Sequence, residues 1–211
     1  MLRTPRAAAA AGIIFSLLLG LAIVLLILSG TPKSPAPGPW LTDPARRSTV
    51  SVALNLVPYA GIAFLWFIGV VRDRIGQRED RFFASVFLGS GLLFVAMLFV
   101  GAAAAGGVLI DTGPAAPAPA GADTLEVARQ ITSLLLRLYA MRMAAVFTMS
   151  TAMITLRTRV VARWISVVGV AVAAVLLVTV GLSVWVELLF PGWILLLSVD
   201  ILRTGLRRRP G

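Results

Sequence analysis

Apolar runs longer than an ordinary buried core helix recur along the chain, and they constrain its fold more than any other feature. The first run, AAAAAGIIFSLLLGLAIVLLIL, carries no charged residue over residues 7–28. About 18 or more apolar residues let a helix cross the hydrocarbon layer of a membrane. A transmembrane barrel instead alternates apolar and polar residues over segments of about ten, and these runs do not alternate. The sequence therefore predicts an all-α fold, a polytopic transmembrane helical bundle.

The apolar runs predict about six spans within a single integral membrane domain, five regular spans and a short or kinked last one. Their expected bounds are residues 7–29, 50–71, 82–110, 132–156, 164–185 and 188–206. The last span contains Pro191-Gly192, which either kinks the helix or begins it with Pro191 at the first helical position. A re-entrant hairpin is a further alternative. Residues 30–49 and 111–126 are rich in proline or alanine and are expected to form outer loops.

The first run has two interpretations. A secretory signal peptide has an apolar stretch of about 7–15 residues that ends in small residues at a cleavage site. The run at residues 7–28 is longer and lacks such an ending. This favours an uncleaved first span, with a cleaved signal peptide as the alternative.

The distribution of basic residues predicts the orientation of the spans. Cytoplasmic loops of membrane proteins carry an excess of Lys and Arg. With the N-terminus inside, the inner segments hold thirteen arginines and the outer loops hold four basic residues. Both termini are therefore expected in the cytoplasm. The first outer loop, with Lys33, Arg46 and Arg47, fits this rule least well.

Composition narrows the function and the source. The chain has no Cys and no His, which excludes thiolate and imidazole catalysis and the usual zinc and haem ligands. No glycine-rich phosphate loop is present, so we expect no enzyme, no cofactor and no metal. Most of the basic residues that give the net charge of +10 flank the apolar runs. This position indicates that they set the membrane topology and do not bind nucleic acid. Arginine outnumbers lysine as in GC-rich genomes, which suggests a bacterial inner (plasma) membrane.

Two arginines interrupt the fourth span. A helix is expected from near Thr124 to Leu156, with Arg137 at its outer boundary and Arg142 about 7 Å deeper. Arg137 can extend its side chain to the lipid headgroups. Burying an arginine near the centre of a span costs about 2.5–3.5 kcal/mol on insertion scales. The fourth span therefore needs polar neighbours at the depth of Arg142.

Asn55 and Glu187 are the expected neighbours, because both fall in the same outer layer of the membrane. The four residues Arg142, Arg137, Asn55 and Glu187 thus form a candidate polar cluster. One hypothesis is a buried structural pair between Arg142 and Glu187 or backbone carbonyls. Another is an outward-facing pocket that binds an anion or a polar solute. A third is a different helix register, in which Arg142 faces a headgroup or a partner subunit.

Small residues mark candidate packing faces. Gly12, Ser16 and Gly20 recur every four residues in the first span. The third span has a small-residue half with the candidate packing residues Gly101, Ala105 and Gly106. Small side chains let helix backbones approach closely in lipid.

These features predict an integral membrane protein that is most simply a non-enzymatic structural or accessory subunit, packing through its small-residue faces. The alternative is a small transporter or channel with its polar site around Arg142, Asn55 and Glu187. Expected partners are the lipid bilayer, a second copy or another membrane subunit, and anionic lipids at the arginine-rich tail, RTGLRRRPG.

Overall fold

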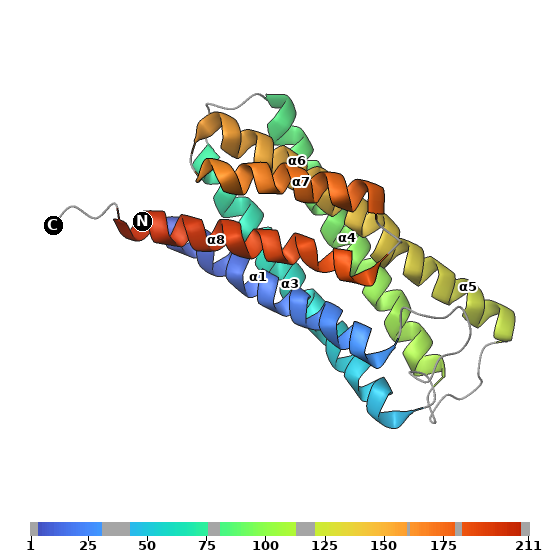
Figure 1. Cartoon of the computed structure of the whole chain (residues 1–211). Helices are drawn as coiled ribbons and strands as arrows, with labels where there is room; N and C mark the ends of the chain where they lie inside the picture. The colour runs from blue at the N-terminus through green and yellow to red at the C-terminus, as the bar shows by residue number, and fades with distance from the viewer. Residues whose placement is uncertain are drawn as a thin grey trace.

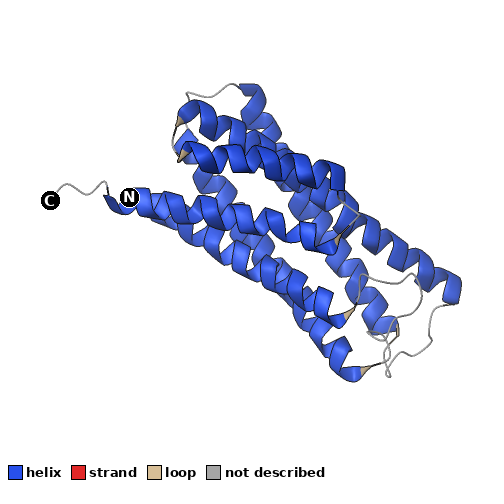
Figure 2. Ribbon diagram, viewed as in Figure 1, coloured by secondary structure: helices blue, strands red, loops and turns tan. Residues whose placement is uncertain are grey.

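The computed structural model describes residues 4–30, 43–75, 81–112, 121–159, 161–179 and 183–207, and these residues form helices joined by short turns (Figure 2). The α-helices are α1 (Thr4–Ser29), α3 (Pro44–Ile75), α4 (Arg81–Asp111), α5 (Ala122–Ser133), α6 (Ala140–Thr158), α7 (Arg163–Thr179) and α8 (Leu189–Arg207). A π-helix, η2 (Leu134–Tyr139), joins α5 to α6, and a 3-10 helix, η3 (Val184–Leu188), precedes α8. Most of the two expected outer loops and the tail residues 208–211 lie outside the described residues.

Within the described ranges, five helical segments are long and apolar enough to cross a membrane. They are Ala7–Ser29, Pro44–Arg72, Phe82–Asp111, Asp123–Thr158 and Val184–Thr204. Helix α7 is also apolar but has only 17 residues. The predicted all-helical fold is confirmed for the described residues, and the five candidate spans support a multi-pass membrane protein.

The helices form a bundle in which each one packs against its neighbours in a closed order. Helix α1 lies against α3 and α8, α4 lies against α3 and α6, and α7 lies against α6 and α8. Successive long helices run in opposite directions, so the start of α1 and the end of α8 lie at the same end of the bundle (Figure 1). We call this the arginine-rich end, defined by Arg72, Arg157, Arg159, Arg163 and Arg203. The other end, where α1 and α4 finish and α3 begins, is the loop end.

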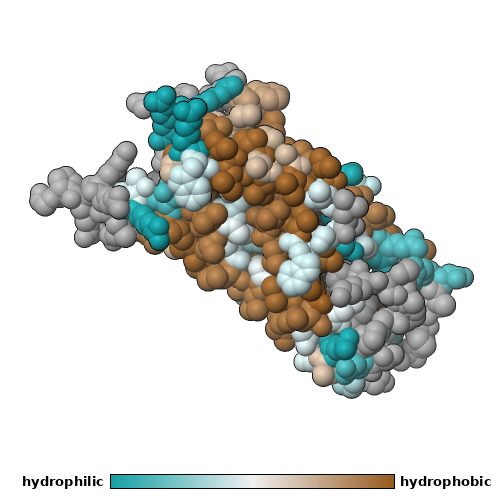
Figure 3. Space-filling model, viewed as in Figure 1, coloured by the Kyte–Doolittle hydropathy of each residue, from teal (hydrophilic) through white to brown (hydrophobic). Residues whose placement is uncertain are grey.

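The surface of the bundle is divided between the two ends and the middle. In the view of Figure 3, polar residues gather towards both ends, and a band of apolar residues covers the helices between them. Large apolar side chains that are exposed on the described helices include Leu17, Leu93 and Val167. Such a band suits contact with lipid.

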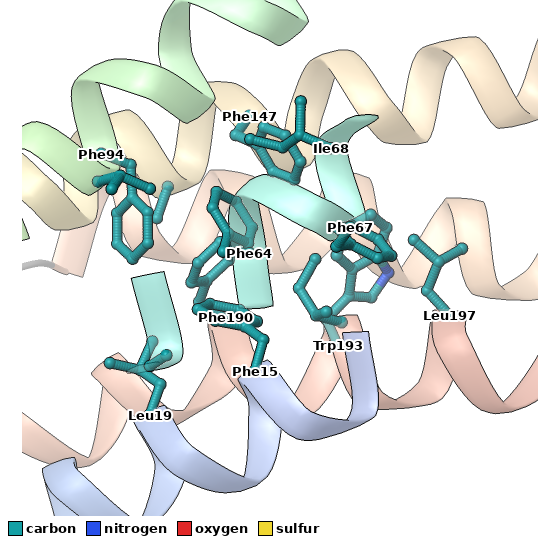
Figure 4. Packing of buried hydrophobic residues seen from close by; sticks show 14 of the residues in the cluster. Phe15, Leu19, Phe64, Phe67, Ile68, Phe94, Phe147, Phe190, Trp193 and Leu197 are labelled. Atoms are coloured by element: carbon teal, nitrogen blue, oxygen red, sulfur yellow. The ribbon is translucent and has the colours of Figure 1, made fainter. Parts of the chain in front are cut away.

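A cluster of buried aromatic rings fills the middle of the bundle (Figure 4). We call it the phenylalanine cluster, and its members are Phe15, Phe64, Phe67, Phe87, Phe94, Phe147 and Phe190, each at most 1% exposed. The Phe64 ring centroid lies 4.5 Å from that of Phe15 and 4.9 Å from that of Phe147. Contacts between tilted or edge-on rings at such distances are favourable beyond their buried area. The cluster therefore joins α1, α3, α4, α6 and α8.

Helix α7 is attached through Trp193 of α8. An added Cβ at Gly169 would lie 2.6 Å from the Trp193 ring, so the bare glycine lets the indole rest against α7. The Trp193 Nε1–H also donates a hydrogen bond to the Ile165 carbonyl oxygen at 3.0 Å. Towards α6, the Thr155 and Ser166 hydroxyl oxygens lie 2.8 Å apart.

The second span begins earlier than expected. Helix α3 starts at Pro44, within the residues predicted as the first outer loop. The Asp43 Oδ1 atom accepts a hydrogen bond from the Ala45 N–H at 3.0 Å, and proline suits the first position of a helix because its missing N–H needs no partner there. The pair Asp43-Pro44 is therefore a helix start.

The C-terminal helices also differ from the expected bounds. Helix α7 ends at Thr179 and not at residue 185, with residues 180–182 outside the described part. The last helix is continuous from Val184 through Pro191 to Arg207, so the chain does not turn back at Pro191 as a re-entrant hairpin requires. The 3-10 turns of η3 end just before the proline, which cannot donate a helical hydrogen bond.

The small residues of α1 have different surroundings. An added Cβ at Gly12 would lie 2.0 Å from the Ser198 Oγ atom and 2.8 Å from a Phe67 ring carbon, so α8 and α3 approach α1 closely there. Ser16 is buried, and its hydroxyl donates to the Gly12 carbonyl oxygen at 2.7 Å. No neighbour among the described residues lies within 4 Å of an added Cβ at Gly20.

The candidate packing residues of α4 also differ in their surroundings. An added Cβ at Gly101 would lie 2.6 Å from Leu136, so this glycine lets the π-helix η2 pack directly on α4. An added Cβ at Gly106 would meet no described neighbour within 4 Å, and Ala105 is half-buried. Gly101 therefore packs against η2, whereas the position of an added Cβ at Gly106 is open.

We expect Gly12→Ala to lower the free energy of unfolding by about 1–3 kcal/mol, because the new methyl group overlaps Ser198 and Phe67. Thermal or denaturant unfolding in detergent measures this change. The matched control on the same helix is Gly20→Ala, where alanine meets no neighbour and favours the helix. Equal effects at both positions would contradict the close approach at Gly12.

Candidate functional site

An ion pair between Arg137 and Glu187 lies near the loop end of the bundle. The Arg137 Nε atom is 3.2 Å from the Glu187 Oε1 atom and donates a hydrogen bond to it. The arginine side chain is 28% exposed and the glutamate side chain 12% exposed. Charges that are partly removed from solvent interact more strongly than fully exposed ones. This pair therefore joins the two segments that carry it.

Both partners come from irregular helical turns. Arg137 belongs to the π-helix η2, and Glu187 belongs to the 3-10 helix η3. Gly101 of α4 leaves room for Leu136, which fixes η2 against α4. A π-helix changes the direction in which the following side chains point, and such turns occur frequently at functional sites. The turns η2 and η3 thus carry the two residues that meet, Arg137 and Glu187.

Arg142 lies apart from this pair. Its side chain is exposed on the surface of α6, and no hydrogen bond or ion pair links it to another residue in the described part of the chain. The sequence suggested Arg142 as the partner of Glu187, but the structure places Arg137 there instead. The alternative in which Arg142 faces a headgroup or another subunit agrees with its exposed position.

Asn55 is also separate from the pair. Its side chain is exposed on α3, and its Nδ2 atom donates to the Ser51 carbonyl oxygen at 2.8 Å. This local bond satisfies part of the amide within its own helix. Of the four residues in the predicted polar cluster, the structure brings together Arg137 and Glu187, while Arg142 and Asn55 lie exposed on other surfaces.

Sequence reasoning missed the role of Arg47. Its guanidinium donates hydrogen bonds to the Thr112 carbonyl oxygen at 3.2 Å, to the Thr112 hydroxyl at 3.0 Å and to the Leu109 carbonyl oxygen. The last carbonyls of a helix have no partner within the helix, and they form the negative end of its dipole. Arg47 at the start of α3 therefore caps the C-terminus of α4.

Asp200 has the complementary role at the arginine-rich end. Its Oδ2 atom accepts a hydrogen bond from the Ala162 N–H at 3.2 Å, just before α7 begins at Arg163. A carboxylate is favourable near the N-terminus of a helix. Asp200 thus links α8 to the start of α7.

Comparisons with known proteins show no similarity that identifies a family: no family model, curated protein or solved structure matches the chain. Among the described residues, no group of three or more His, Cys, Asp or Glu side chains is arranged to hold a metal ion.

Arg137→Met and Glu187→Leu are each expected to lower the free energy of unfolding by about 1–3 kcal/mol, because each removes an ion pair that is largely shielded from solvent. The double variant should recover at least half of the summed loss. A double-mutant cycle from unfolding curves in detergent measures this coupling. In the control cycle, Arg142→Met and Glu187→Leu should be additive, and strong coupling there would contradict the observed pairing.

Arg47→Met is expected to lower the free energy of unfolding by about 1–2 kcal/mol, because the C-terminal carbonyls of α4 lose their cation. The neighbouring Arg46→Met is the control. Its ion pair with Asp43 is 3.5 Å long and both side chains are nearly half exposed, so its effect should be close to zero. If both variants behave alike, Arg47 does not stabilise α4.

Proposed function

We propose that this chain is a non-enzymatic structural or accessory subunit, embedded in the membrane, that binds a second copy or another membrane protein through the outer face of α4. The observation that carries the proposal is that small residues lie exposed along this face, between larger apolar side chains. Ala96, Ala103 and Gly107 are exposed there, with Val100 between them. An added Cβ at Gly107 would meet no described neighbour within 4 Å.

The physical basis is the way helices associate in lipid. Apolar side chains gain little by leaving one apolar surface for another, so association depends on close backbone approach and good packing. A face of alanine and glycine permits that approach. Inside this bundle Gly12 and Gly169 already serve such close contacts, and the face of α4 offers the same surface chemistry to the outside.

The proposed topology has six spans with both termini in the cytoplasm of a bacterial cell, in its plasma membrane. The spans are α1, α3, α4, the continuous α5–η2–α6 helix, α7, and η3 with α8. Helix α7 has 17 residues and is about 25 Å long, slightly shorter than a hydrocarbon layer of about 30 Å. The gathering of arginines at the end where α1 starts and α8 finishes supports the cytoplasmic assignment.

The alternative function, a small transporter or channel, receives less support. A solute path needs polar groups that face a shared interior. Here the phenylalanine cluster occupies the middle of the bundle, and Arg142 and Asn55 are exposed on different helices. The observation in favour of a transporter is the Arg137–Glu187 pair between two irregular helical turns.

Ala103→Phe is expected to dissociate the proposed complex, because a phenyl ring on α4 keeps a second helix from approaching its backbone. The measurement is the mass of the chain purified in mild detergent, by light scattering after gel filtration. Wild type should have at least twice the monomer mass of 22.3 kDa, and the variant should be monomeric.

The matched control is Ala171→Phe, which places the same ring on the exposed surface of α7. It should leave the mass unchanged. A monomeric wild type would exclude a second copy as the partner, and equal masses above that of the monomer for wild type and Ala103→Phe would contradict the α4 interface. Stabilisation of the isolated monomer by one polar solute would instead favour the transporter.

A further inference from the structure

Arg142 and Tyr139 form an exposed polar pair on the surface of the fourth span. Tyr139 is 45% exposed and Arg142 is also exposed. Residues three positions apart on a helix share a face, and Tyr139 lies one turn closer to the loop end. We infer that this pair binds the phosphate group of a phospholipid in the membrane leaflet at the loop end.

The depth of Arg142 suits a headgroup phosphate. Arg142 lies five residues beyond Arg137, which is about 7 Å along the helix axis. Side chains on a helix tilt towards its N-terminus, and the N-terminal side of α6 is the loop end. The long arginine stem can therefore lie along the apolar surface while its guanidinium reaches the headgroup level.

The chemistry of the two side chains also suits this ligand. A guanidinium presents a planar set of N–H donors that matches two oxygens of a phosphate group. The tyrosine hydroxyl adds a donor one turn nearer to the membrane surface, where aromatic rings with a polar tip are favoured. Arg142 and Tyr139 thus offer hydrogen-bond donors to the two free oxygens of a phosphodiester group from one helix face.

The charge of Arg142 needs an anion from outside the chain. Glu187 is already paired with Arg137. Asp200 lies at the opposite end of the bundle, where it accepts a hydrogen bond from Ala162. The other acidic residues of the sequence lie outside the apolar part of the spans, so a second copy in the same orientation brings no carboxylate to the level of Arg142. Lipid phosphates surround the bundle at the headgroup level, which the extended arginine side chain can reach.

The inference rests on the six-span topology proposed above, but it does not depend on a partner at α4. The test uses the full chain, stripped of lipid by washing in dodecyl maltoside. Its unfolding midpoint is measured with added dioleoylphosphatidylglycerol, with dioleoylglycerol, which has no phosphate, and with inorganic phosphate. The mass of each sample is measured in parallel, so that loss of an α4 complex is seen separately from loss of lipid binding.

Phosphatidylglycerol should raise the unfolding midpoint of wild type by about 4 °C or more, and dioleoylglycerol and inorganic phosphate should raise it far less. Arg142→Gln, which keeps a polar side chain for folding, should lose most of this rise. Tyr139→Phe should lose a smaller part. Arg46→Gln, at an exposed arginine in the first turn of α3 at the same end, should keep it.

Four outcomes overturn the inference. An equal rise with dioleoylglycerol means that the lipid acts only through its chains. An equal rise with inorganic phosphate means a site for a soluble anion. An undiminished rise in Arg142→Gln removes the arginine from the site. A changed mass in Arg142→Gln, with the lipid effect retained, means that Arg142 contacts a protein partner.

Discussion

Aromatic packing in the middle of the bundle is the interaction on which the remaining contacts depend. Phe15, Phe64, Phe94, Phe147 and Phe190 come from five different helices and meet at centroid distances of 4.5 to 6.3 Å. In lipid, such complementary packing replaces the hydrophobic effect as the force between helices. Because the rings fill the centre, the ionised residues of the spans lie near the helix ends or on the outer surface.

Charged residues near the ends of the spans serve the helix termini. Arg47 lies against the last carbonyls of α4, and Asp200 lies against the first N–H groups before α7. Each charge has the sign that the local helix dipole favours. In the proposed topology, this contact gives Arg47 a structural role in the segment that fits the positive-inside rule least well.

The sequence predicted the class of the fold well, because long apolar runs admit few structures in lipid. It placed the start of α3 too late, although Asp43-Pro44 is a helix-start signal that could have been recognised. It named Arg142 as the partner of Glu187, whereas the structure pairs Glu187 with Arg137. In an α-helix, residues five apart differ by about 140° in direction, and the π-helix η2 alters this angle. The packing of Leu136 on Gly101, invisible in one sequence, accompanies that π-helix.

Because aromatic rings fill the centre of the bundle, the residues available to bind a partner or ligand lie on its outer surface. A membrane protein that carries a solute keeps polar groups towards its interior, whereas this bundle places Arg142 and Asn55 on its surface and rings at its centre. The face of α4 presents small residues where close approach is possible, and the face of α6 presents a charge that lipid tails cannot neutralise. The two surfaces differ in chemistry, so they call for different neighbours: another helix at α4 and an anion at α6.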